Sequence, residues 1–235
     1  MVVVSDLQQI YNPSYFGVVT DKYIWEEKQT DSTALSSIEF VFTGGTISYV
    51  KSDLLKNLQN AFRTDSTKTL NLRKICDGLL FLDRGDEHYF IILEVKSGFN
   101  EVKNKAVSQI PASYVKAKSI LNDFKTYNNI EYKEFGLIVS YPYVVIPMTD
   151  SENNSVVMRY KREMVGDKNE IITSKYSKLL KDAHSATFLG SDFEFDKLTG
   201  VKQELFFDTL SVKHYPVDNH CVNAKIDLDD VIRSL

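Results

Sequence analysis

The sequence contains few of the residues that mark several common classes of protein. Its 235 residues include only two cysteines, Cys76 and Cys221, which excludes a four-cysteine zinc or iron–sulfur site and indicates a reducing compartment. No run of apolar residues approaches the roughly 18 that a membrane-spanning helix needs. The first residues lack a basic region ahead of their apolar run, so we expect no signal peptide and a cytoplasmic protein.

Internal repeats, low-complexity segments and linkers rich in Pro, Gly or Ser are also absent from the sequence. A composition of 43% hydrophobic and 26% charged residues is ordinary for a globular protein. We therefore expect a single domain over residues 1–235, with its core at 52–142 and additions at 1–51 and 143–235. The four histidines show no metal-ligand spacing with one another, and we interpret them as structural or surface residues.

Acidic and basic residues are unevenly distributed along the chain. The net charge is −4, but residues 96–133 carry seven lysines against three acids. A polyanion responds to the local field of a surface rather than to the net charge, so this stretch is a candidate for binding nucleic acid. We single out Lys103, Lys105 and Lys116 for contacts with a nucleic-acid backbone. The alternative is that these lysines keep the outer side of an amphipathic helix hydrated.

Hydrophobic periodicity predicts an α/β fold, because a helical crossover between strands is typical of a sheet whose faces are covered. The Pro inside the longest helical stretch predicts a kink there or a helix that begins at that point. The expected elements are strands at 38–42 and 46–50 around the Gly44-Gly45 turn, a helix at 52–63 capped by Ser52-Asp53, strands at 72–82 and 88–96 around the turn residues 83–86, a helix at 101–125 containing Pro111, a strand at 135–140, helices between 157 and 183, and a terminal helix at 229–235.

The turn between the two central strands determines which side chains share a face of the sheet. With an even-numbered turn that pairs Asp83 with Asp86, Asp77 points to the same face as Glu94 and Lys96. Asp77 is then diagonal to Glu94, at roughly 7–8 Å between their Cα atoms. Two carboxylates at that distance can converge on one metal ion.

Such a set of side chains suits the hydrolysis of a phosphodiester. A hard cation held by carboxylates neutralises the phosphoryl oxygen and lowers the pKa of the attacking water, and a lysine beside it adds positive charge where the transition state needs it. Oxygen ligands without a nearby histidine or cysteine favour Mg²⁺, or Mn²⁺ as a substitute, over zinc. The alternative is an edge-strand salt bridge between Glu94 and Lys96, with Asp77 as a surface residue near a turn.

The segment CDGLLFLDRGDEHYFIILEVKSG, followed by a helix, resembles the PD-(D/E)XK nuclease superfamily. The resemblance covers roughly residues 52–140 and implies a restriction-endonuclease-like fold, a mixed central sheet flanked by helices. It also implies that Asp77 and Glu94 bind the metal ion together with the backbone carbonyl of Val95, and that Lys96 is the catalytic lysine. Cysteine stands where the motif's name has proline.

Two further features of the superfamily have partial counterparts here. Gln109 and Tyr114, early in the helix that follows, are similar to the Gln…Tyr element of RecB-type members, although the spacing is one residue longer. We therefore add Gln109 to the catalytic set. No upstream helical glutamate stands out, and Glu26, Glu27 and Glu39 are the candidates.

These observations predict a Mg²⁺-dependent nuclease that cuts DNA, as an endonuclease rather than an exonuclease, with RNA as the second candidate substrate. Cutting both strands with one site per chain usually needs two protomers, so we expect a homodimer or another homo-oligomer. A role in host defence or restriction follows only by analogy with the superfamily. Two rivals stay open: a nuclease-like nucleic-acid-binding or assembly protein that does not cut, and a non-nuclease α/β domain in which Glu94 and Lys96 form a surface ion pair.

Overall fold

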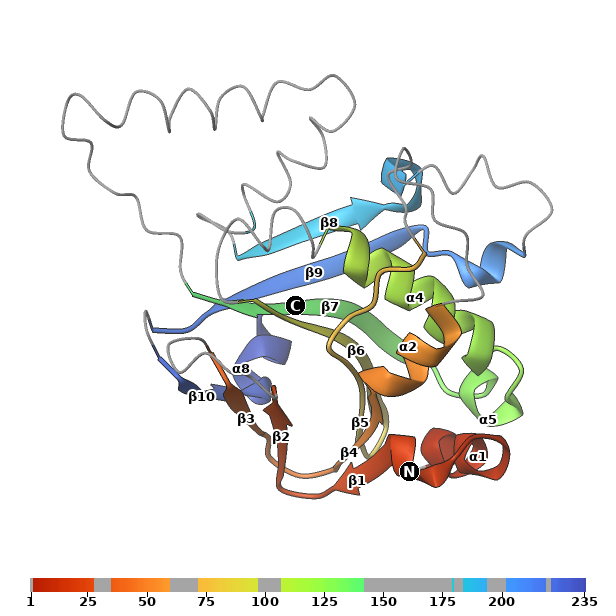
Figure 1. The fold of residues 1–235 in the computed structure, drawn as a ribbon, viewed down its shortest axis with the longest axis horizontal. Coiled ribbons are helices and arrows are strands. Elements are labelled where there is room, and N and C mark those ends of the chain that lie inside the picture. The colour runs from red at the N-terminus through yellow and green to blue at the C-terminus, as the bar shows by residue number, and fades with distance from the viewer. Residues whose placement is uncertain are drawn as a thin grey trace.

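A seven-stranded mixed sheet forms the centre of the protein (Figure 1). The computed structural model describes residues 2–27, 35–59, 72–96, 107–141, 179, 184–193, 202–218 and 221–235. The elements in chain order are α1 (Val2–Ile10), η1 (Pro13–Tyr15), β1 (Phe16–Val19), β2 (Lys22–Glu26), β3 (Ser37–Val41), β4 (Thr46–Lys51), α2 (Ser52–Gln59), β5 (Gly78–Arg84), β6 (Glu87–Lys96), α4 (Val107–Leu121), α5 (Lys125–Asn128), β7 (Tyr132–Ser140), β8 (Ser185–Leu189), η3 (Gly190–Phe193), η5 (Gln203–Leu205), β9 (Thr209–Pro216), β10 (Asn223–Asp227) and α8 (Leu228–Arg233).

The strand order in the large sheet is β1-β4-β5-β6-β7-β9-β8. Strands β4, β5 and β6 are successively antiparallel, whereas β7 is parallel to β6 because the chain crosses over through α4. Strand β9 is parallel to β7, and β8 closes the edge in the antiparallel direction. The prediction of an α/β protein with a mixed central sheet flanked by helices is confirmed.

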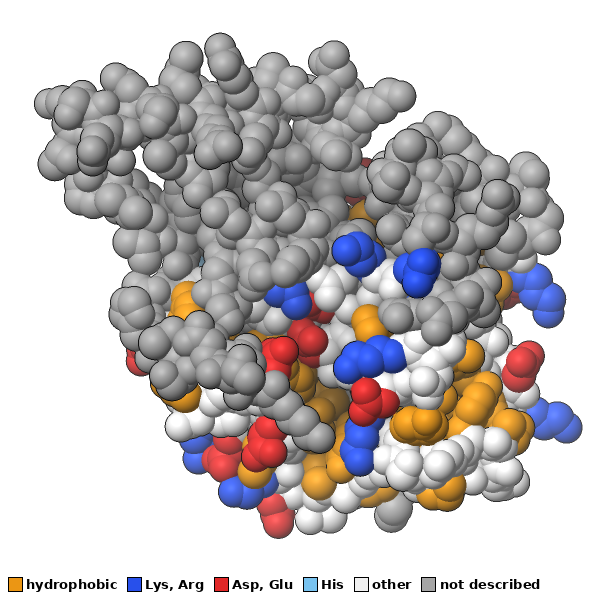
Figure 2. Space-filling model, in the orientation of Figure 1, with side chains coloured by type: hydrophobic (Ala, Val, Ile, Leu, Met, Phe, Trp, Pro, Cys, Tyr) orange, Lys and Arg blue, Asp and Glu red, His pale blue; other side chains and the backbone are white. Residues whose placement is uncertain are grey.

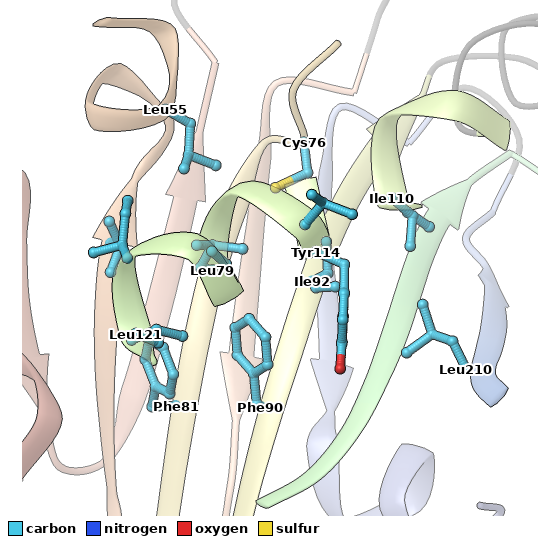
Figure 3. Packing of buried hydrophobic residues seen from close by; sticks show 14 of the residues in the cluster. Leu55, Cys76, Leu79, Phe81, Phe90, Ile92, Ile110, Tyr114, Leu121 and Leu210 are labelled. Atoms are coloured by element: carbon cyan, nitrogen blue, oxygen red, sulfur yellow. The ribbon is translucent and has the colours of Figure 1, made fainter. Parts of the chain in front are cut away.

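Helices α1, α2, α4 and α5 cover one face of this sheet. In Figure 3, Phe81 and Phe90 of the central hairpin point toward α4, and their rings stack at 4.9 Å between centroids. Gly136 in β7 lets α4 approach closely, since a Cβ there would meet Ile110 at 3.0 Å. Strand β6 is buried on both faces, which explains its nearly continuous apolar sequence.

A second, three-stranded sheet covers the opposite face. Its order is β10-β3-β2, and together with α8 it buries a separate apolar layer against β4, β5, β6 and β7. Strand β10, near the C-terminus, pairs in parallel with β3. The predicted terminal helix is confirmed as α8, and the side chain of Asp227 caps it by accepting a hydrogen bond from the N–H of Asp229.

Several boundaries differ from the sequence prediction. The strands expected at 38–42 and 46–50 are confirmed as β3 and β4, but they lie in different sheets. Gly44 and Gly45, with φ of 64° and 94°, turn the chain from one sheet to the other. The strand expected from residue 72 begins only at Gly78.

The predicted helix at 101–125 is observed as α4 from Val107 to Leu121, with Pro111 inside it, followed by the short α5. Residues 101–106, and the predicted helices between 157 and 183 apart from residue 179, lie outside the described residues. Within the described part of the chain, no helix is both long enough and apolar enough to cross a membrane.

Candidate active site

The central hairpin brings Asp77, Glu94 and Lys96 together, although its register differs from the predicted one. The turn consists of Gly85 and Asp86, so Arg84 pairs with Glu87 rather than Asp83 with Asp86. Gly85 has a φ of 55°, which suits the tight turns of hairpins. The partner of each residue therefore moves by two positions, which leaves every side chain on its predicted face. Continued by one residue from the Gly78–Leu93 pair, this register places Asp77 next to Glu94 rather than diagonal to it.

Asp77 lies immediately before β5, alongside the end of β6. Its backbone N–H donates to the carbonyl of Leu93 at 2.9 Å, and its Oδ2 accepts a hydrogen bond from the backbone N–H of Val95 at 2.7 Å. Both strands thus hold the carboxylate in place.

Three oxygen atoms converge on the ammonium group of Lys96. Its Nζ donates to the Val95 carbonyl at 2.9 Å, lies 3.5 Å from Oδ2 of Asp77, and forms an ion pair with Oε1 of Glu94. We call Asp77 Oδ2, Glu94 Oε1 and the Val95 carbonyl oxygen the oxygen triad. A cation therefore occupies the position that these oxygens share.

Burial makes the two carboxylates costly to ionise. The side chain of Glu94 is fully buried, and its pKa is raised well above its ordinary value by that burial and then by the charge of Asp77, against the opposing effect of Lys96. Burial also raises the pKa of Asp77, while Lys96 and the N–H of Val95 counteract it. Positive charge at the triad is what allows both groups to ionise together.

The oxygen triad fits a hard divalent cation. Both carboxylate oxygens of Glu94 are buried; Oε1 lies against the Lys96 ammonium, whereas Oε2 accepts no hydrogen bond within the described residues. The Lys96 ammonium stands in for a cation, and carboxylate and carbonyl oxygens are the ligands that Mg²⁺ and Mn²⁺ prefer. The part of the chain that the structure describes contains no group of three His, Cys, Asp or Glu side chains suited to a metal, so the third protein ligand would be the Val95 carbonyl.

The structure separates the three candidate upstream glutamates. Glu27 follows β2 and lies near the site, because its negative charge raises the pKa of both Asp77 and Glu94. Glu26 lines a cleft beside Asp77. Glu39 is instead held in β3 by Lys22 and Lys225, and has no part in the site.

Helix α4 fixes the segment that leads to Asp77. The side chain of Gln109 donates to the carbonyl of Ile75 at 2.6 Å, Ser113 Oγ accepts from the N–H of Cys76 at 2.7 Å, and Lys116 Nζ donates to the carbonyl of Lys74. These bonds use backbone groups of residues 74–76 that would otherwise pair with a neighbouring strand. This explains why β5 begins at Gly78 and not at residue 72.

The hydrogen bonds of α4 bear on two predicted roles. Lys116 is fully buried, which does not fit the prediction that it contacts a nucleic-acid backbone. Gln109 binds the chain before Asp77 through the carbonyl of Ile75, and its catalytic role stays a prediction. Ser113 was missed, although its spacing from the other two (109, 113, 116) places all three on one helical face. Lys103 and Lys105 lie outside the described residues.

Tyr114 does not belong to the site. Its hydroxyl donates to Glu134 at 2.5 Å, next to Tyr127 and Lys118, which bind the same carboxylate. This network lies C-terminal to Gln109 in α4 and next to the start of β7, where Glu134 stands. The predicted Gln…Tyr element therefore lacks its second member at the site.

A polar cleft of about 490 Å³ opens beside Asp77. One wall is formed by β2 and Glu27 after it, and the other by the end of β4 and the first turns of α2. Figure 2 shows acidic and basic side chains next to one another on this face. The lining residues are Tyr23, Ile24, Trp25, Glu26, Glu27, Tyr49, Lys51, Ser52, Asp53, Lys56 and Asp77.

Comparisons of this chain with protein-family models, with curated protein sequences and with solved structures give no match.

Proposed function

We propose that this protein is a divalent-metal-dependent nuclease of the PD-(D/E)XK kind that hydrolyses phosphodiester bonds in DNA. The observation that carries the proposal is the oxygen triad, in which the buried carboxylate of Glu94, the partly buried carboxylate of Asp77 and a backbone carbonyl converge on a cation. The order of three antiparallel strands, a crossover helix and a parallel strand supports it, because it resembles the restriction-endonuclease-like core named above.

In this proposal Asp77, Glu94 and the Val95 carbonyl would hold Mg²⁺, which would supply charge neutralisation at the phosphoryl oxygen and a water of lowered pKa. The ammonium of Lys96, beside these oxygens, would stabilise the negative charge that develops on the phosphate. Gln109 and Ser113 keep Asp77 in position from α4.

The cleft beside Asp77 is the proposed path of the nucleic-acid strand. Lys51 and Lys56 on its α2 side replace the buried Lys116 as backbone contacts, and both are exposed. The acids on its β2 side repel a phosphate chain unless a cation is bound, which makes substrate binding depend on the metal. A homodimer, for cutting both strands, also remains a proposal, and the mass of the protein in solution tests it.

A nucleic-acid-binding protein that does not cut is the second candidate. The observation in its favour is that Lys96 already neutralises the two carboxylates, so the triad is satisfied without any metal.

Cleavage assays separate the two candidates. Purified protein is incubated with supercoiled DNA, linear DNA and RNA in Mg²⁺, Mn²⁺ or EDTA, beside Lys96→Ala and the control Lys22→Ala, whose ammonium pairs with Glu39 in the three-stranded sheet. We expect metal-dependent cutting by the wild type and the control, and none by Lys96→Ala. Binding without cutting under every condition would favour the second candidate, and the products distinguish endonuclease from exonuclease action.

A further inference from the structure

Ser140, His214 and His184 form a polar row at the carboxyl end of the parallel strands β7 and β9. Oγ of Ser140 lies 2.9 Å from Nε2 of His214, and the Nδ1 atoms of the two histidines lie 3.4 Å apart. The backbone N–H of His214 donates to the carbonyl of His184 at 2.9 Å, so the two histidines face each other beside the β8–β9 ladder.

The hydrogen bonds of Ser140 determine which nitrogen of His214 carries the proton. The Ser140 hydroxyl donates its single proton to the carbonyl of Tyr141 at 3.0 Å, and therefore accepts a hydrogen bond from Nε2–H of His214. Nδ1 of His214 then keeps a lone pair.

The separation of the two Nδ1 atoms matches two ligands of one ion. Hydrogen bonds from N–H groups usually span about 2.7–3.2 Å, which is shorter than the 3.4 Å found here. Two nitrogens bound at about 2.05 Å to a tetrahedral Zn²⁺ ion lie about 3.35 Å apart. His184 also has a φ of 47°, an uncommon backbone conformation for a residue other than glycine, and such conformations gather at functional sites.

We propose that His184 and His214 form a second metal site, which binds a transition-metal ion such as Zn²⁺ through their two Nδ1 atoms. Water completes the coordination, and the ion reaches the site from solvent because His184 is exposed. Ser140 acts as the partner that holds the other nitrogen of a metal-binding histidine and fixes its orientation.

The two histidines lie apart from the oxygen triad, although Ser140 pairs with Lys96 across β6 and β7. Register places His214 beside Ile138 and Ile138 beside Glu94, so the histidine stands two strands, or about 10 Å, away from the glutamate. Its nitrogen donors select Zn²⁺, Ni²⁺ or Cu²⁺, whereas the oxygen triad suits Mg²⁺. The proposal does not depend on nuclease activity.

Calorimetric titration with Zn²⁺ in a buffer containing excess Mg²⁺ tests this site. We expect one Zn²⁺ ion per chain, and Co²⁺ in its place should give the visible absorption of a tetrahedral complex. His184→Ala should weaken Zn²⁺ binding at least about tenfold, and Ser140→Ala by about 10- to 100-fold. His184 is exposed, so its replacement should preserve the fold, which circular dichroism checks.

Two control variants sharpen the result. His88→Gln changes a histidine that binds Asp83 elsewhere, and should leave Zn²⁺ binding unchanged. Glu94→Gln alters the oxygen triad alone, and should also leave it unchanged. No Zn²⁺ binding by the wild type, or equal binding by His184→Ala, would overturn the proposal and leave a hydrogen bond between the rings. Binding that is lost in Glu94→Gln but kept in His184→Ala would assign the ion to the oxygen triad, which also overturns it.

Discussion

Replacing Lys96 by methionine tests whether a cation belongs at the oxygen triad. Methionine has an unbranched side chain but no charge, so the fully buried Glu94 and the nearby Asp77 lose the ammonium that lies against them. Removing one partner of a buried ion pair costs about 3–5 kcal/mol. At about 2–4 °C per kcal/mol for a chain of this size, the melting temperature should fall by about 6–20 °C in EDTA at pH 8.

Divalent metal should reverse much of this loss. At a concentration of 100 times its dissociation constant, a bound ion stabilises the folded state by about 2.7 kcal/mol. The wild type gains less from the same concentration, because its own ammonium must first leave the triad. Mg²⁺ or Mn²⁺ should therefore raise the melting temperature of Lys96→Met by more than that of the wild type.

The measurement is thermal unfolding with and without metal, followed by circular dichroism. Lys22→Met serves as the control, because its partner Glu39 is partly exposed and surface ion pairs contribute only about 0–1 kcal/mol. Equal melting temperatures for Lys96→Met and wild type in EDTA, or equal shifts with metal, would refute the idea that the lysine occupies a cation position.

Three further perturbations follow from the same geometry. Because burial raises the pKa of Glu94, the metal-free protein should lose stability as the pH rises from 4.5 through the folded-state pKa; Glu94→Gln should flatten that decline in urea titrations. Ser113→Ala leaves the buried N–H of Cys76 unpaired, which should cost about 1–3 kcal/mol in the same titrations and weaken Mg²⁺ binding in calorimetry. Lys51→Ala and Lys56→Ala should each raise KM for DNA with little change in kcat, and each should lower the salt slope of binding by about 1; an unchanged slope would remove that residue from the proposed path of the strand.

The association of Asp77 with Glu94 and Lys96 could be predicted because it depends on the parity of side chains and not on the hairpin register. A register shift of two positions leaves each side chain on its face, so the error in the turn did not change which side chains share that face. Side chains alternate between the two faces along β6, and Glu94 follows a run of apolar residues. These two features were enough to identify Glu94 as an unusual buried charge.

Roles that depend on distant partners could not be predicted in this way. The sequence places Gln109 and Lys116 on a helix, but it does not reveal that Ile75 and Lys74 lie within reach of their side chains. For the same reason the proximity of His184 and His214 has no local signal, since β8 and β9 are separated by more than a dozen residues. The pairing of strands that are distant in sequence depends on tertiary packing, and hydrophobic periodicity reports only local structure.

The parallel pairing of β3 with β10 has a consequence for the timing of folding. Ser36 and Val222, next to these strands, are hydrogen-bonded although 186 positions separate them. A ribosome must therefore release the chain as far as β10 before the three-stranded sheet can close, and contacts of such high sequence separation form slowly. Until then the apolar layer under that sheet stays exposed, on the reverse side of the hairpin that carries Glu94. We expect a chain that stops before Asn223 to aggregate or to be degraded, and limited proteolysis of nascent chains of increasing length would show protection of the central strands only when β10 has emerged.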